Sequence, residues 1–197
     1  MKRMKVKLTF TESILGTCPA NEDIYRAYIG SKSPDAETIE DEVAALGEEA
    51  VTEKAMTVFP RNKDGVPFVY DYQIKGFFKD TCGGLRKVSS TKSAKIKAFK
   101  KEIDKLIFPF PREIPFENYE PIGECQRPLR ASTPMGERVS LAISEEIPAG
   151  ATITFEIVLH CEEHEDAVRE WLDYGCFSGL GQWRNSGKGR FTWEEIS

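Results

Sequence analysis

Alternating apolar and polar residues predict two long strands, one at residues 4–10 and the other at residues 151–160. Because successive side chains of a strand point to opposite faces, each segment is expected to bury one face. The apolar positions are Val6, Leu8 and Phe10 in the first segment and Ile153, Phe155, Ile157 and Leu159 in the second.

Apolar residues at helical spacing predict amphipathic helices over residues 73–86, 93–106 and 164–177. Their stripes consist of Ile74, Phe77, Phe78, Cys82 and Leu85; of Ile96, Phe99, Ile103 and Leu106; and of Val168, Trp171, Leu172 and Phe177. Two further helical patterns lie within the acidic residues 21–53. We expect these to form a helical insertion after the first strand.

Shorter apolar runs bounded by turn residues predict the remaining strands. Residues 111–121 carry several prolines and are expected to be irregular. Strands are predicted over residues 56–59 and 66–72 as a hairpin, over 107–110, over 125–131 and 138–143 as a second hairpin, and from Phe191 onward.

The C-terminal segment 179–190 combines glycines with cations and an indole. Glycine allows positive φ and close approach of the backbone, so this loop could present N–H groups to a ligand. Its cations would neutralise phosphates, and its tryptophan could stack on a base. The alternative is a tight turn with solvated cations. The residues are Gly179, Gly181, Gly187 and Gly189 with Trp183, Arg184, Lys188 and Arg190.

A second candidate site is the start of the predicted helix over 73–86. Lys75 and Gly76 would place an ammonium group beside the free amides of a helix N-terminus, where a phosphate could dock. The alternative is a core helix with one exposed lysine. The hairpin arginines Arg127, Arg130 and Arg138 could line a further basic surface.

Composition sets the broad class. The chain has 197 residues, 40% of them hydrophobic, and a net charge of −5, which fits one domain with an insertion at about 21–53. Acidic residues dominate positions 12–53 and basic residues 75–101, as in a protein with one face for a polyanion and another for a basic partner or a second copy. Five scattered cysteines without a Cys-x-x-Cys pair favour a reducing cytoplasm. No apolar run approaches the roughly 20 residues needed to cross a membrane.

Sequence signals for catalysis are weak. His160 and His164 flank a cysteine and two glutamates, but no second ligand pair completes a zinc site. Walker and Gly-x-Ser-x-Gly motifs are absent from the sequence. We therefore expect a binding protein without a metal or cofactor, and not an enzyme.

Several of these motifs together carry a resemblance. The helix start Gln73-Ile-Lys-Gly76 with its end at Leu85-Arg86, the turn Pro148-Ala-Gly150 and the C-terminal glycine-rich loop resemble those of the RAMP superfamily of CRISPR-associated proteins, closest to Cas7-like subunits. The chain is also similar to uncharacterised phage and prophage proteins. The resemblance implies an α+β, ferredoxin-like (RRM-like) antiparallel sheet with helices on one face, and binding of single-stranded RNA.

The chain also departs from the enzymes of that superfamily. RNA-cleaving members usually use an early histidine, whereas both histidines here are late. Other members use a metal and an aspartate near the first helix, where this chain has Asp23 and Asp35. Both aspartates fit equally well as helix-start acids.

The leading hypothesis is a non-catalytic binder of single-stranded RNA or DNA, of phage or prophage type, with possible self-association or a host or phage protein partner. One alternative is a protein-interaction module, such as an anti-CRISPR factor or RAMP mimic that binds a host complex; another is a metal-dependent ribonuclease. The candidate binding residues are Lys75, Gly76, Lys79, Arg86, Arg127, Arg130, Gly181, Trp183, Arg184, Gly187, Lys188, Gly189 and Arg190.

Overall fold

The computed structural model describes residues 1–20, 56–133 and 136–196, with the backbone alone over 129–140. The insertion predicted at about 21–53, with Asp23 and Asp35, lies outside the described residues. So does the side chain of Arg130.

The main sheet is antiparallel and is built around the two long strands that the alternation predicts. β1 pairs with β10 from Lys2↔Leu159 to Thr9↔Thr152, which places the apolar positions of both strands on one face. The order is β11-β1-β10-β7-β5, with β6 also paired to β10. The strands are β1 (Lys2–Phe10), β5 (Phe68–Tyr70), β6 (Ile107–Phe110), β7 (Glu113–Glu117), β10 (Thr152–Leu159) and β11 (Phe191–Glu195).

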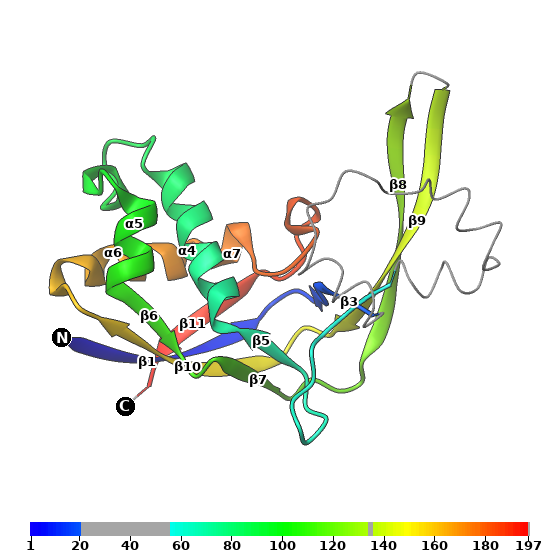
Figure 1. The fold of residues 1–197 in the computed structure, drawn as a ribbon, viewed down its shortest axis with the longest axis horizontal. Coiled ribbons are helices and arrows are strands. Elements are labelled where there is room, and N and C mark those ends of the chain that lie inside the picture. Colours follow the sequence, from blue (N-terminus) through cyan, green and yellow to red (C-terminus); the bar gives the residue numbers. More distant parts are fainter. Residues whose placement is uncertain (21–55, 134–135, 197) are drawn as a thin grey trace.

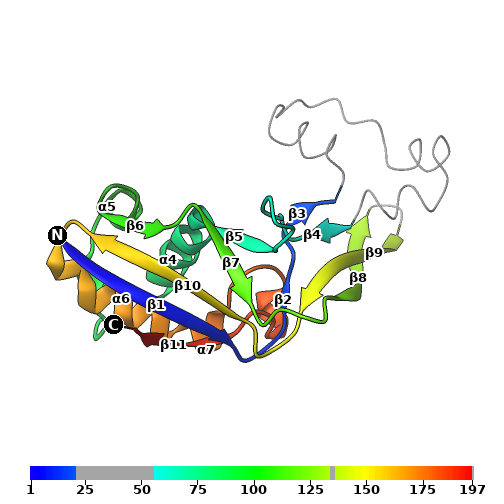
Figure 2. The same cartoon turned by 90° about the horizontal axis from the view of Figure 1, so that it is seen from below.

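Helices of the described residues cover one face of this sheet, as Figure 1 shows, and none covers the other face in Figure 2. The core lies between them, where Phe78 of α4 packs against the fully buried Trp171 of α6. The helices are α4 (Asp71–Leu85), α5 (Phe99–Leu106), α6 (Glu165–Asp173) and α7 (Gly175–Ser178). None of them is long and apolar enough to cross a membrane.

A second, smaller sheet carries a long two-stranded arm that projects from the body (Figure 1). β8 and β9 pair from Gly123↔Glu146 to Thr133↔Gly136, so the predicted second hairpin is confirmed and extends further than its sequence pattern indicates. The strands are β2 (Ile14–Leu15), β3 (Cys18–Pro19), β4 (Thr57–Val58), β8 (Gly123–Thr133) and β9 (Gly136–Ile147).

Two predicted helices differ in their bounds. Residues 164–177 form η2 (Glu162–His164), α6 and α7, with the break at Tyr174. Residues 93–106 begin as the short turn η1 (Ser93–Lys95), and α5 starts only at Phe99. Ile96 and Ala98 are not helical, which separates the two elements. The Glu170 carboxylate accepts hydrogen bonds from the backbone of Lys92 and Ser93 and ties η1 to α6.

Two strand predictions also need correction. Residues 113–117 are not irregular but form β7, in which Ile114 and Phe116 are buried between exposed neighbours. The expected hairpin of residues 56–59 and 66–72 keeps its turn, but β4 and β5 enter different sheets. In the segment that joins β4 to β5, the structure has one isolated β-bridge, between Arg61 and Pro67.

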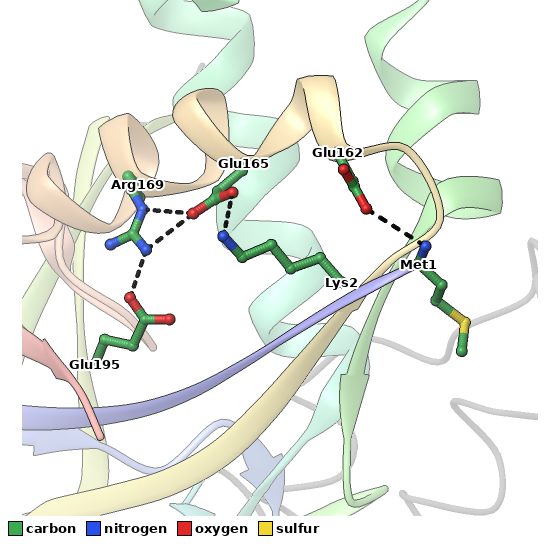
Figure 3. A network of polar contacts seen from close by, with 6 residues as sticks. All are labelled: Met1, Lys2, Glu162, Glu165, Arg169 and Glu195. Carbon is green, nitrogen blue, oxygen red and sulfur yellow. Dashed lines mark hydrogen bonds and ion pairs between the residues drawn. The ribbon is translucent and has the colours of Figure 1, made fainter. Parts of the chain in front are cut away.

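A polar network joins the two ends of the chain to α6 (Figure 3). Lys2 Nζ lies 2.6 Å from Glu165 Oε2, and Arg169 donates to Glu165 Oε1 at 3.0 Å. Arg169 also pairs with Glu195 of β11, while the N-terminal amine lies 3.7 Å from Glu162. The hydrogen bonds from Lys2 and Arg169 lower the pKa of Glu165.

Glu165→Gln should therefore destabilise the fold at pH 7 but not in acid. A carboxylate whose pKa is lowered by folding stabilises the protein above its unfolded pKa, and this contribution is lost as the pH falls through the folded value. Urea unfolding should show a gap between wild type and variant that closes below about pH 4. The exposed neighbour Glu163→Gln is the control, and a gap equally large at pH 3 and pH 7 would contradict the assignment.

Candidate nucleic-acid interface

The glycine-rich loop between α7 and β11 closes on itself. Leu180 N donates to Gly189 O at 2.8 Å, and Gly189 N donates to Ser13 O at 2.8 Å. A Cβ on Gly189 would lie 1.8 Å from Leu180 O, and one on Gly179 would lie 2.6 Å from Lys188 O. Both glycines have positive φ, as expected for this loop. Their immediate role is to let the two arms of the loop touch, so the amides at its base are not open to a ligand.

Lys188 belongs to this closed base. Its Nζ lies 2.5 Å from Glu146 Oε1 of β9 and 2.7 Å from Ser13 Oγ. Burial raises the pKa of Glu146, but the hydrogen bonds from Lys188 and Ser13 outweigh it and leave the pKa lowered. The ion pair is only about a quarter exposed. Lys188 is thus engaged within the protein, which favours the structural interpretation of this cation.

The tip of the loop carries the residues that remain accessible. Trp183 is 41% exposed and adopts a left-handed conformation, with φ of 54°, which is uncommon outside glycine. The Arg127 guanidinium of β8 lies 5.3 Å from its ring centre and donates to Gln182 Oε1 at 2.7 Å. Arg127 is buried, and its Nη1 has no hydrogen-bond partner among the described residues. Arg190 follows the base of the loop, where its carbonyl accepts a hydrogen bond from Thr11 N, but its side chain is exposed with the guanidinium beside Gly187.

A groove of about 310 Å³ separates the loop from α4. Arg184 crosses this groove, and its Nη1 lies 2.8 Å from Asp80 Oδ2 of the helix. Both side chains are partly exposed, and an exposed ion pair of this kind is worth roughly 0–1 kcal/mol. A phosphate could therefore compete for Arg184. The lining residues are Thr17, Gln73, Gly76, Phe77, Asp80, Leu180, Gly181 and Arg184.

Gly76 lines this groove and leaves open space above the α4 backbone, at the floor of the groove. It lies in the interior of α4 and is exposed, and a Cβ built on it would meet nothing within 4 Å. An interior helix glycine costs roughly 0.5–1 kcal/mol relative to alanine. Packing within the described residues does not require glycine here. The absence of a side chain at Gly76 instead leaves room for a ligand to approach the helix backbone closely.

The structure separates Lys75 from this groove. α4 begins at Asp71, not near Ile74, so Lys75 and Gly76 lie one turn inside the helix and not at its free amides. Lys75 Nζ lies 4.2 Å from the Phe108 ring centre and donates to Asp104 O at 3.2 Å, and burial lowers its pKa. The proposed phosphate site at the helix start does not form in this geometry.

The other two predicted cations of α4 lie toward α5. Lys79 Nζ is 2.5 Å from Asp104 Oδ1, and the Arg86 guanidinium lies 5.1 Å from the Phe99 ring centre. Asp80, Thr17 and Gln73 were not predicted as site residues. The signal for Asp80 was its spacing of four residues from Gly76, which places both on one helix face. Among the described residues, no three His, Cys, Asp or Glu side chains gather as metal ligands.

Comparisons with known proteins bear on the fold. No protein-family model matches the chain, and no curated protein matches its sequence. Its fold is similar to that of a chain in the cryo-EM structure of the type III-B Cmr-beta bound to cognate target RNA, with 13% identity and a TM-score of 0.54. The match covers all of this chain but 60% of that one. The likeness supports a mixed α+β fold compatible with the RAMP-like fold, and it speaks to the fold alone.

Lys188→Met should destabilise the protein, because it leaves the mostly buried Glu146 without a counter-charge. We expect the free energy of unfolding in urea at pH 7 to fall by about 1–3 kcal/mol. The double variant Lys188→Met/Glu146→Gln should recover part of this loss. A Lys188→Met protein as stable as wild type would show that the ion pair contributes nothing to the fold.

Proposed function

We propose that the protein binds single-stranded nucleic acid in the groove between α4 and the glycine-rich loop. The observation that carries the proposal is Gly76, an exposed helix glycine with open space above it on the floor of that groove. Arg184 and Arg190 would bind phosphates, and the exposed face of Trp183 would stack on a base. Binding, and not catalysis, is the activity that we assign to it.

The strand order supports a ferredoxin-like RAMP domain as the scaffold. α4 lies in sequence between β1 and β6, and α6 lies between β10 and β11. With β2–β5 and β7–β9 taken as additions, this order matches a β-α-β-β-α-β succession. Spatially, β11, β1, β10 and β6 are neighbours in that order. We propose one such domain over 1–197 with the insertion after its first strand. The phage or prophage setting implied by the sequence resemblance is part of the same proposal.

RNA is the polymer that we favour. The structural neighbour was determined with cognate target RNA, and the sequence resemblance points to proteins that commonly bind single-stranded RNA. Base stacking on Trp183 would accept either polymer, because every base offers a flat face. Partners in the cell would then include RNA, together with the further protein subunits that RNA-bound assemblies of this kind contain.

Fluorescence anisotropy with labelled single-stranded RNA and DNA, at low and at physiological salt, tests the proposal. Arg184→Ala should weaken binding and reduce the slope of log K against log salt by about 0.7, the value for one phosphate contact on a single strand. Lys5→Ala removes an exposed cation from the face of the sheet that bears no described helix, and should leave the loop contacts intact. No binding at low salt would contradict the function.

Two substitutions in α4 should separate binding from folding. Gly76→Gln should leave the helix at least as stable, because glutamine has the higher helix propensity, while its side chain fills the groove and weakens binding about tenfold or more. Asp80→Asn should instead tighten binding by up to about fivefold, because it frees Arg184 and removes a negative charge. Thermal unfolding measured in parallel excludes misfolding. Unchanged affinity in both variants would place the ligand elsewhere.

A further inference from the structure

A second, larger groove of about 680 Å³ continues from the first along α4. Gly76 and Asp80 line both grooves, so the two adjoin beneath the Arg184–Asp80 ion pair. The second groove then follows the same face of α4 through Gly83 and Gly84 to Lys87. Its other wall consists of Phe99 and Lys100 at the start of α5 and of Tyr174 and Ser178 at α7.

An exposed aromatic pair stands at this wall. Tyr174 and Phe177 have ring centres 5.7 Å apart and exposed fractions of 37% and 66%. Phe177 continues the buried stripe of the predicted helix over 164–177, but the break at Tyr174 turns it out to solvent. Two adjacent exposed rings beside a groove offer flat apolar faces to a ligand, with Phe177 the more accessible of the two.

The groove also carries a positive charge. Lys79, Lys87 and Lys100 line it, with Lys79 paired to Asp104 and the acidic Asp80 paired to Arg184. Lys87 and Lys100 are exposed and form no ion pair with any described residue. The two ammonium groups of Lys87 and Lys100 beside two exposed rings match a chain of phosphates that alternates with flat bases. A duplex keeps its bases stacked inside, so the rings select an unpaired strand.

We propose that this second groove binds the next nucleotides of the strand held by the first groove. Bases stack on Tyr174 and Phe177, and phosphates pair with Lys87 and Lys100. The strand passes over the open face of α4, where Gly76 and Gly84 leave space above the helix. The inference rests on the proposed function and adds a second group of contacts to it. None of Tyr174, Phe177, Lys87 and Lys100 is among the residues that the sequence motifs single out for binding.

The test is a length series of single-stranded oligonucleotides, from about two to about twelve nucleotides, measured by competition anisotropy. Wild-type affinity should rise with length until both grooves are filled. Phe177→Ala and Tyr174→Ala should each weaken binding of the long oligonucleotides by about fivefold to a hundredfold, the range for one lost base stack, and leave the shortest unchanged. Phe110→Ala, at a 50%-exposed ring on another part of the sheet, is the matched control.

A second pair of variants tests the charges separately. Lys87→Ala/Lys100→Ala should reduce the salt slope for long oligonucleotides by about 1.4, or two phosphate contacts, and leave the slope for the shortest unchanged. Lys87 and Lys100 are exposed, so their substitution removes little buried surface, and circular dichroism checks the fold of all the variants.

The outcomes distinguish the two proposals. If affinity is independent of length and the four substitutions have no effect, the second groove is not used, while the first site stands. If no oligonucleotide binds at any length, the proposed function fails and this inference fails with it. If polyglutamate competes as well as an oligonucleotide and Phe177→Ala has no effect, the groove binds acidic chains by charge alone, and the stacking role is overturned.

Discussion

Two backbone hydrogen bonds position the candidate site: Leu180 to Gly189 and Gly189 to Ser13. They require an approach so close that any side chain at Gly189 would overlap Leu180 O. The Lys188–Glu146 pair secures the same base against β9. With the base fixed in this way, Arg184 near the tip of the loop reaches Asp80 of α4. The glycines therefore act through the geometry of the loop, and the contacts that we assign to the ligand come from its tip.

The helix under this loop, α4, packs its inner face into the core and carries on its outer face a glycine that lowers helix stability. Ile74, Phe77 and Phe78 anchor α4 in the core, while Gly76 on its outer face lowers helix propensity without a packing reason among the described residues. An interior helix glycine costs roughly 0.5–1 kcal/mol relative to alanine, and packing among the described residues does not explain it here. Close passage of a strand over the helix is the gain that we infer. The Arg184–Asp80 pair fits this view, because a weak exposed bridge can yield to phosphate.

Local alternation of apolar and polar residues was enough to predict part of the fold. β1 and β10 follow from period-two patterns, and the long hairpin follows from its turn residues. What failed depended on distant contacts. Glu170, 77 residues away in the sequence, binds the backbone of Ser93 in η1, and the break at Tyr174 exposes Phe177. Likewise, the glycine-rich loop was identified as a basic element, but the partner of each cation depends on tertiary structure. Lys75 reaches Asp104 and Phe108, and Lys188 reaches Glu146, so neither faces the groove.

The most direct test of the central claim is photocrosslinking of the protein to single-stranded RNA that contains 4-thiouridine, followed by mass spectrometry of the linked peptides. We predict crosslinks in two segments that are far apart in the sequence, the outer face of α4 between Gly76 and Lys87 and the loop tip around Trp183. Crosslinks confined to the uncovered face of the main sheet, on β1 and β10, would contradict it and would place the strand on the opposite side of the molecule.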